Sequence, residues 1–423
     1  MTITAFEGPA GTGKTHSLLE QLKNAMRQRP LTEHGRVLAL TFMHGSRRRL
    51  DARLQEVETL DRRFQAETID GFAWRLCQRW QMLARSLGHA IPNEGDYNGT
   101  CALAARLLAR PAVSSWIGVS YPYVIVDEAQ DLSIERSSMI REAIGPSHVF
   151  LGFDEFQCLD PNLRPPPIEE WVREHCDPVR LDRCMRTENA ELLEAARAVR
   201  DGRAVNTNGR RFKVAITPSV PFAATYLANS IAWRQGGDVA VLTPSRRGGF
   251  AQGAVELVRT RALGPQQNGP FNIEWESTDA DESETLRRRL TLPANNTVAA
   301  ALLQLEPHTA IPAIKVASDW IKHQRRVLGV SEISADAVHR TIDRALSVRR
   351  RIRRQSASNY VAMTIQQAKN QEFDHVVIVW PHTVPNNNEQ KRRLLYNAIT
   401  RARRSCLVLV QAERLAEAPP FTA

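Results

Sequence analysis

Residues Gly8–Thr15 read Gly-Pro-Ala-Gly-Thr-Gly-Lys-Thr and fit the pattern G-x-x-x-x-G-K-[ST]. The apolar run Ile3–Phe6 precedes them and the helical pattern Ser17–Arg27 follows, which restricts this part of the chain to a strand–loop–helix unit of an α/β fold. Glycines let the backbone wrap a pyrophosphate, and the amides and dipole of the next helix favour that anion. Lys14 is expected to reach the β- and γ-phosphates and Thr15 to bind Mg²⁺. An ordinary glycine-rich turn is the alternative, but the context predicts a nucleoside triphosphate site.

Short apolar runs alternate with longer helical patterns along the rest of the chain, as in parallel-sheet α/β domains. Between Gly248 and Ser358 the pattern changes, and from Val298 to about Arg354 it indicates helices without a clear strand. We therefore predict a helical subdomain inserted in the second α/β unit. Expected strands are Ile3–Phe6, Val37–Phe42, Val124–Asp127, Val149–Gly152, Phe212–Ile216, Val239–Thr243, Val361–Thr364, Val376–Trp380 and Leu407–Val410.

The apolar run that begins at Tyr123 ends in two adjacent carboxylates, Asp127 and Glu128. The carboxyl ends of parallel strands form the edge at which α/β sheets hold ligands. Phosphoryl transfer needs one carboxylate for a metal ion and another to orient or deprotonate the attacking water. Both residues could instead cap a following helix. Together with the phosphate loop, the pair favours hydrolysis of the triphosphate over binding alone.

Composition indicates ordinary globular domains with a basic balance. The 423 residues are 43% hydrophobic and 24% charged, which excludes a disordered or collagen-like chain, and this length suggests roughly two to four domains. The formal charge is 56 − 46 = +10, and because seven of the 56 basic residues are lysines, 56 − 7 = 49 are arginines. Arginine suits phosphate contacts, so a polyanionic partner is one explanation of the excess and a coding bias is the other.

The N-terminal residues and the cysteines predict the compartment. Met1–Glu7 has no basic stretch before an apolar core, and no run in the sequence approaches the ~20 apolar residues of a spanning helix. The six cysteines form no Cys-x-x-Cys pair, so we expect buried reduced thiols rather than disulfides or metal ligands. The expectation is a soluble, cytoplasmic protein that contacts no membrane.

The phosphate loop and the carboxylate pair, with six further motifs along the chain, resemble those of the UvrD/Rep-like superfamily 1 DNA helicases. Gly8–Thr15 is similar to the family's motif I, and Asp127-Glu-Ala-Gln-Asp131 is similar to its motif II. Together the eight motifs reach from Gly8 to Ala402 in the family's order. The others are Thr41-Phe42 (Ia), Thr68-Ile-Asp-Gly-Phe72 (Ib), Asp154-Glu-Phe-Gln157 (III), Leu181-Asp-Arg-Cys-Met-Arg186 (IV), Thr364–Glu372 (V) and Leu395–Ala402 (VI).

The resemblance implies an α/β fold with two RecA-like parallel-sheet P-loop NTPase domains and reduced helical insertions. The implied N-terminal domain is 1–185, with a short insertion at about 73–120. The implied C-terminal domain is 186–423, with an insertion at about 246–357. Because duplex-engaging subdomains normally sit at these two places, their small size indicates a compact member of the family.

The resemblance also assigns roles to particular residues. Gln157 is expected to sense the γ-phosphate, Arg186 and Arg401 to act as phosphate fingers, and Glu372 to contact the nucleotide sugar. Expected catalytic residues are Lys14, Asp127, Glu128, Gln157, Arg186 and Arg401. ATP is expected to lie against Gly8, Ala10, Gly11, Thr12, Gly13, Lys14, Thr15 and Glu372, with Mg²⁺ on Thr15 and Asp127. DNA contacts are expected at Phe42, Arg47, Arg48, Arg49, Thr68, Phe72, Thr364 and Lys369.

Several of these expectations have open alternatives. Phe42 and Phe72 are candidates for stacking on bases, with burial in the core as the alternative. The basic runs Arg287–Arg289 and Arg349–Arg354 contact DNA phosphates or form solvated helix faces. Met185 stands where the family usually carries a tyrosine that stacks on adenine, so the resemblance assigns no base-stacking residue to this position.

The implied function is an ATP-dependent DNA translocase or helicase, in which DNA-stimulated hydrolysis drives movement along single-stranded or partly duplex DNA. The family's direction is 3′ to 5′. The alternative is a regulatory DNA- or nucleotide-sensing ATPase subunit of a DNA-repair or phage-defence complex, which works with a nuclease partner and unwinds little alone. A nucleic-acid-binding protein with an inactive ATP site is a third hypothesis.

Overall fold

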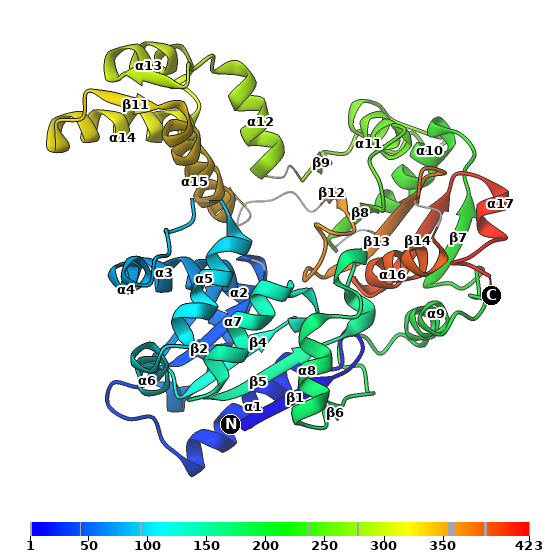
Figure 1. Cartoon of the computed structure of the whole chain (residues 1–423). Helices are drawn as coiled ribbons and strands as arrows, with labels where there is room; N and C mark the ends of the chain where they lie inside the picture. The colour runs from blue at the N-terminus through cyan, green and yellow to red at the C-terminus, as the bar shows by residue number, and fades with distance from the viewer. Residues whose placement is uncertain are drawn as a thin grey trace. The chain divides into compact units, whose positions relative to one another are not determined.

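The structure is a computed structural model that describes residues 2–42, 44–93, 95–234, 237–276, 279–353, 360–384 and 387–422. The chain divides into two compact units (Figure 1). The larger unit comprises residues 1–269 and 364–423, and the helical unit comprises residues 270–363. No helix in the described ranges is both long enough and apolar enough to cross a membrane.

The first sheet has six parallel strands in the order β3-β2-β4-β5-β1-β6. Its strands are β1 (Thr2–Glu7), β2 (Val37–Thr41), β3 (Phe64–Thr68), β4 (Tyr123–Asp127), β5 (His148–Phe153) and β6 (Val179–Arg180). The four strands predicted here are confirmed. Sequence reasoning missed β3, because Gln65 and Glu67 dilute its apolar pattern at the edge of the sheet. Since Thr41 pairs with both Thr68 and Asp127, motifs Ia, Ib and II begin at the same edge of the sheet.

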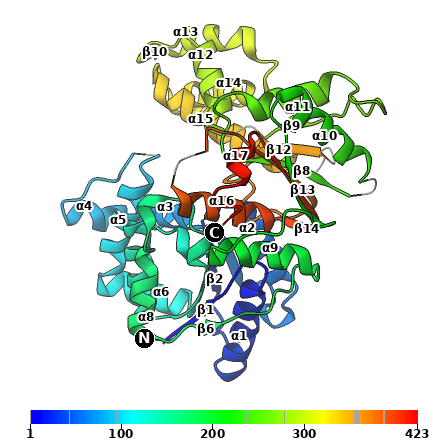
Figure 2. The same ribbon diagram turned by 90° about the vertical axis from the view of Figure 1, so that its right-hand side faces the viewer.

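Helices cover both faces of this sheet (Figure 2). Leu18 and Leu22 of α1 and Leu50 of α2 pack in the core on one face. Leu76, Leu107 and other residues of α3 and α5–α8 pack in the core on the other face. The helices are α1 (Lys14–Gln28), α2 (His44–Gln55), α3 (Ile69–Arg79), α4 (Gln81–Ser86), α5 (Tyr97–Leu108), α6 (Pro111–Ser120), α7 (Ile134–Ile144) and α8 (Pro167–His175). Single 3₁₀ turns are η1 (Glu58–Leu60), η2 (Ala129–Asp131), η3 (Glu155–Gln157) and η4 (Pro161–Leu163).

The second sheet also has six strands, in the order β7-β14-β13-β8-β12-β9. The strands are β7 (Phe212–Ile216), β8 (Val239–Thr243), β9 (Glu274–Trp275), β12 (Tyr360–Thr364), β13 (Phe373–Trp380) and β14 (Ala402–Val410). The five strands predicted here are confirmed, and β13 and β14 start earlier than predicted. The accompanying helices are α9 (Ala190–Asp201), α10 (Val220–Ala232), α11 (Phe250–Thr260), α16 (Asn388–Ile399) and α17 (Glu413–Ala416). Two parallel sheets confirm the expected α/β class.

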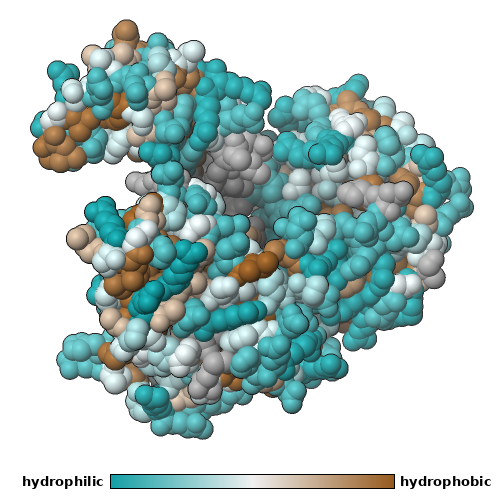
Figure 3. Space-filling view, viewed as in Figure 1, coloured by the Kyte–Doolittle hydropathy of each residue, from teal (hydrophilic) through white to brown (hydrophobic). Residues whose placement is uncertain are grey.

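The helical unit has a core of its own, which includes Leu305, Ile314, Ile321 and Ile342. Its helices are α12 (Asp279–Arg289), α13 (Val298–Leu305), η5 (Glu306–His308), α14 (Pro312–Leu328) and α15 (Ala335–Arg353). Contrary to the expectation of helices alone, β10 (Asn295–Thr297) and β11 (Glu332–Ser334) form a short antiparallel pair. Three-residue strands are too short to show a period of two in the sequence. Apolar side chains also reach the surface of this unit, visible as brown areas in Figure 3.

Two residues of α14 test the core of the helical unit. Ile321 is 0% exposed and Val316 is 50% exposed. We expect Ile321→Ala to lower the free energy of unfolding by about 2–5 kcal/mol, because it leaves a cavity. The matched control Val316→Ala should change it by no more than about 0.5 kcal/mol. Urea denaturation measures both, and equal losses would contradict this core.

Candidate nucleotide site

The phosphate loop connects the end of β1 to Lys14, the first residue of α1. Gly11 and Gly13 have φ values of 80° and 83°, which side chains rarely adopt. A Cβ on Gly8 would lie 2.5 Å from the Leu181 carbonyl oxygen. The loop therefore needs its glycines both for its turn and for close packing against the motif IV segment.

The Lys14 side chain lies inside this loop and is only 7% exposed. Its ammonium donates to the Gly8 oxygen at 2.8 Å and to the Pro9 oxygen at 3.1 Å. A cation held beside the N-terminus of a helix, in a loop of backbone amides, forms a cradle for phosphate groups. The structure thus brings Lys14 and the predicted loop residues together.

Asp127 ends β4 directly beside Thr15, whose hydroxyl donates to Asp127 Oδ2 at 2.8 Å. Burial, reinforced by the neighbouring Glu128, raises the pKa of Asp127 to about 6. A buried carboxylate with this environment is stabilised by a cation, and Mg²⁺ prefers hard oxygen ligands such as these two side chains. Thr15 and Asp127 therefore fit the predicted Mg²⁺ site.

Glu128 has a left-handed backbone, with φ at 60° and ψ at 45°. Such a conformation is uncommon outside glycine and is typical of functional sites. Its Oε2 accepts a hydrogen bond from Gln130 Nε2 at 2.6 Å. Although burial opposes ionisation, Lys14 and Lys369 hold the pKa of Glu128 below its ordinary value. Glu128 is thus an ionised carboxylate that can accept a hydrogen bond from water.

Hydrogen bonds connect Glu128 to the second sheet. Gln130 Oε1 accepts from the Asp154 amide at 3.1 Å, and Asp154 Oδ2 accepts from Gln157 Nε2 at 2.9 Å. Gln157 Oε1 then accepts from Arg401 Nη2 at 3.2 Å. The predicted water-orienting group, γ-phosphate sensor and arginine finger therefore belong to one network.

The Arg401 side chain is 2% exposed, although it carries a charge. Burial and the nearby Arg186 lower its pKa to about 10, which leaves the guanidinium protonated at neutral pH. Within the described ranges, no carboxylate forms an ion pair with it. A buried cation is costly unless it meets an anion. The arrangement therefore suits a phosphate ligand.

Arg186 and Glu372 form an ion pair of 2.9 Å beside this site. Arg403 pairs with the same carboxylate at 3.2 Å, while Arg186 Nη1 donates to the Thr400 oxygen at 2.8 Å. Burial works against ionisation of Glu372, but Arg186 and Arg403 hold its pKa below the ordinary value. The predicted finger and the predicted sugar ligand are thus adjacent.

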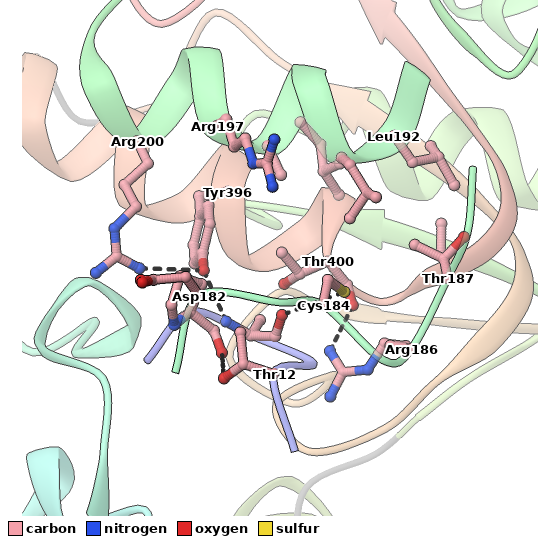
Figure 4. A pocket seen from close by; sticks show the side chains of 16 residues that line it. Thr12, Asp182, Cys184, Arg186, Thr187, Leu192, Arg197, Arg200, Tyr396 and Thr400 are labelled. Carbon is pink, nitrogen blue, oxygen red and sulfur yellow. Dashed lines mark hydrogen bonds between the residues drawn. The ribbon is translucent and has the colours of Figure 1, made fainter. Parts of the chain in front are cut away.

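A pocket lies next to the phosphate loop, between it, the motif IV segment and helices α9 and α16 (Figure 4). Its walls include Leu192 and Arg197 of α9, and Thr12 of the loop. Tyr396 points from α16 toward the loop, and Arg200 lies beside it. The pocket shows that α9 and α16 are close to the phosphate loop.

The two phenylalanines proposed for base stacking differ in exposure. Phe42 is 37% exposed, and the centre of its ring lies 5.4 Å from the guanidinium carbon of Arg136. Phe72 is 1% exposed and packs edge-on against Tyr121, at 6.3 Å between ring centroids. A base cannot stack on a buried ring, so the stacking prediction is wrong for Phe72 and its core alternative applies. For Phe42, DNA contact stays a prediction.

Three other predicted DNA residues have partners within the protein. Thr68 caps α3, with its hydroxyl accepting from the Gly71 amide at 3.1 Å. The Thr364 hydroxyl donates to Gln367 Oε1 at 3.0 Å. Lys369 is 9% exposed and pairs with Asp131 at 2.5 Å. Contact of these residues with DNA is untested.

The basic runs have different surroundings. Arg49 interacts electrostatically with Glu372, Glu128 and Asp127, which places it near the carboxylates of the candidate nucleotide site. DNA contacts of Arg47, Arg48 and Arg49 remain predictions. In α12, Arg287 pairs with Asp343 and Arg288 with Glu284, as a solvated helix face would. The side chains of Arg349–Arg354 lie outside those that the structure describes.

Sequence reasoning missed three residues that join this network. Asp154 and Tyr396 belong to motifs III and VI, but no pattern in the sequence shows that their side chains meet. Arg200 lies on α9 outside every motif, and its guanidinium pairs with Asp154 at 3.0 Å. Only the folded chain brings these residues together.

The fold and the site define a P-loop NTPase with two parallel sheets. Residues 1–212, half of the chain, match the AAA domain family model, and residues 359–409 match the UvrD-like helicase C-terminal domain. The chain belongs to the AAA domain family. The second match confirms the resemblance to UvrD-like helicases.

Comparison with solved structures gives similarity to the arterivirus nonstructural protein 10 helicase, in a crystal structure of the helicase and in a structure of its complex with DNA. Both matches have 12% identity, with TM-scores of 0.40 for the free protein and 0.39 for the complex. They cover 99% and 98% of this chain, which spans 62% of the length of the viral chains. No curated protein sequence matches.

The contrast between Phe42 and Phe72 gives a test of the predicted DNA contacts. Phe72→Ala should lower the free energy of unfolding by about 3–5 kcal/mol, since it empties a core position. Phe42→Ala should lower it by less than about 1 kcal/mol and weaken binding of a labelled oligothymidylate, because stacking contributes roughly 1–3 kcal/mol per base. Urea unfolding and fluorescence anisotropy measure the two effects. Unchanged affinity in Phe42→Ala would remove Phe42 from the DNA contacts.

Proposed function

We propose that this chain is a DNA-stimulated ATPase that converts hydrolysis of ATP into movement along single-stranded DNA. The observation that carries the proposal is Arg401, a buried guanidinium that donates to Gln157 of η3 and that, among the residues the structure describes, forms no ion pair with a carboxylate. A γ-phosphate held by the loop would supply the missing negative charge. Hydrolysis then depends on how the two sheets are placed relative to each other, which is the requirement for a motor.

The chemistry assigned to the site is in-line attack of water on the γ-phosphorus with ADP leaving. The ionised Glu128 orients the water, and Lys14, Arg186 and Arg401 stabilise the charge that develops on the transferred group. Thr15 and Asp127 would hold Mg²⁺, which when bound neutralises phosphate charge. Gln157 hydrogen-bonds to Arg401 and to Asp154. A γ-phosphate that attracts Arg401 would therefore change the contacts of Gln157.

Movement on DNA would follow from contacts between the sheets that change with the nucleotide. Lys369, which motif V places among the DNA-binding residues, pairs with Asp131 of motif II. Gln157 and Arg401 form a second link. We infer that these links transmit the state of the nucleotide to the DNA-binding surface. The resemblance gives 3′ to 5′ as the direction of translocation.

Replacement of Glu128 tests the catalytic assignment. Glu128→Gln keeps the size of the side chain and removes its charge, so we expect ATP turnover to fall at least about 100-fold, with the fold and nucleotide binding retained. Glu142→Gln on the exposed side of α7 is the matched control and should keep full turnover. Phosphate release with and without single-stranded DNA is the measurement. Full activity in a folded Glu128→Gln variant would contradict the assignment.

A regulatory ATPase subunit with a nuclease partner is the second candidate function. It is favoured by the burial of Phe72 and by the ion pair of Lys369 with Asp131, which leave fewer side chains to bind DNA. A strand-displacement assay on the isolated chain separates the two candidates, with 3′-tailed and 5′-tailed duplexes as substrates. The motor predicts displacement of the 3′-tailed duplex. DNA-stimulated turnover without displacement of either duplex would favour the regulatory subunit.

A further inference from the structure

The hydroxyl group of Tyr396 joins three parts of the larger unit. It accepts a hydrogen bond from the Ala10 amide of the phosphate loop at 2.8 Å. It donates to Asp154 Oδ2 of motif III at 3.3 Å and accepts from Arg200 Nη1 of α9 at 3.3 Å. A phenolic hydroxyl can donate one hydrogen bond and accept two, so all the hydrogen bonds that this group can make are formed. Tyr396 is 2% exposed, which excludes water as a ready replacement.

The ring of Tyr396 also contacts the first part of the chain. It packs edge-on against Phe156 of η3, with 5.1 Å between ring centroids. The guanidinium carbons of Arg393 and Arg200 lie 4.9 Å and 5.5 Å from the centre of the Phe156 ring. Arg393 also pairs with Glu155 at 3.0 Å. Helix α16 is thus fixed both to η3 and, through one hydroxyl, to the phosphate loop.

Arg401 follows α16 directly in the chain. Its Nε donates to the Asn397 oxygen at 2.9 Å and its Nη2 to the Thr400 hydroxyl at 3.3 Å, both within the same segment. The hydrogen bond that it makes across to the first sheet goes to Gln157, at 3.2 Å. The place of the guanidinium at the phosphate site therefore depends on how α16 is aligned with the loop.

We infer that Tyr396 is a positioning residue, whose hydroxyl aligns α16 with the phosphate loop and thereby holds the Arg401 guanidinium at the γ-phosphate. The inference rests on the proposed function, since it takes Arg401 as a group that stabilises charge during hydrolysis. Loss of the hydroxyl would leave the Ala10 amide and Asp154 each without one partner, and α16 would keep its contacts with η3 but lose its hydrogen bond to the phosphate loop. Burial and Asp154 raise the pKa of Tyr396, so the hydroxyl keeps the proton that it donates.

Tyr396→Phe removes the hydroxyl and keeps the ring on Phe156. We expect kcat for ATP to fall about tenfold, the size of one lost hydrogen bond in the transition state, while KM changes less than about threefold. Tyr123→Phe is the matched control, because Tyr123 is 3% exposed and its hydroxyl contacts the Ala25 and Arg29 oxygens at 3.0 and 2.6 Å, away from the loop. It should keep the wild-type kcat. Thermal unfolding checks that both variants are folded.

A double-mutant cycle with Arg401→Ala tests whether Tyr396 acts through Arg401. If it does, Tyr396→Phe lowers kcat in the wild-type background and has no further effect in Arg401→Ala. Arg401→Lys replaces Arg401→Ala in the cycle if the alanine variant does not fold. Additive losses would overturn the inference, as would an increase in KM at unchanged kcat, which would mean that the hydroxyl serves nucleotide binding alone.

The proposed function and the role of Tyr396 can be contradicted separately. Absence of ATP turnover in the folded wild-type chain, with and without DNA, would contradict the proposed function. Normal turnover in the wild type together with a wild-type kcat in Tyr396→Phe would contradict only the role of Tyr396.

Discussion

A buried guanidinium that forms no ion pair with a carboxylate needs negative charge from elsewhere, and within the part of the chain that the structure describes Arg401 is in this position between the two sheets. At 2% exposure it loses most of its hydration, and its pKa of about 10 still keeps it charged. The carboxylates of Glu128 and Glu372 attract it only through space. A phosphate bound in the loop would satisfy the charge far better. The arrangement of the two sheets is therefore suited to a nucleotide between them, and the other contacts can be understood from this requirement.

The second sheet and its helices contact motif III at every residue from 154 to 157. Arg200 pairs with Asp154, and Arg393 pairs with Glu155 and lies over the ring of the next residue. Arg401 contacts the last residue of the motif. These arginines are committed to contacts within the protein, so they cannot bind DNA at the same time. Part of the net positive charge therefore serves the nucleotide site, and fewer than the 49 arginines are available to contact DNA.

Features encoded in consecutive residues could be predicted from the sequence. The phosphate loop, the carboxylates after β4 and the apolar strands depend on local chemistry and periodicity, and the structure contains them. Strand β3 was missed because the polar residues Gln65, Glu67 and Thr68 occupy three of its five positions. The burial of Phe72 follows the apolar spacing of Ile69, Phe72, Ala73 and Leu76 on one face of α3. The contact of Tyr396 with Ala10, 386 residues away in sequence, depends on tertiary packing. Periodicity carries no information on such contacts.

The end of β4 places two carboxylates with different tasks side by side, and backbone geometry separates them. Asp127 completes the strand and meets Thr15, whereas the left-handed conformation of Glu128 turns its side chain toward Gln130. Glu128 is stabilised as an anion by Lys14 of the loop and by Lys369 of motif V. Because Lys369 follows β12 of the second sheet, the charge of Glu128, which we propose to orient water, depends on both sheets. In the proposed mechanism, hydrolysis is thus linked to their placement through Glu128 as well as through Arg401.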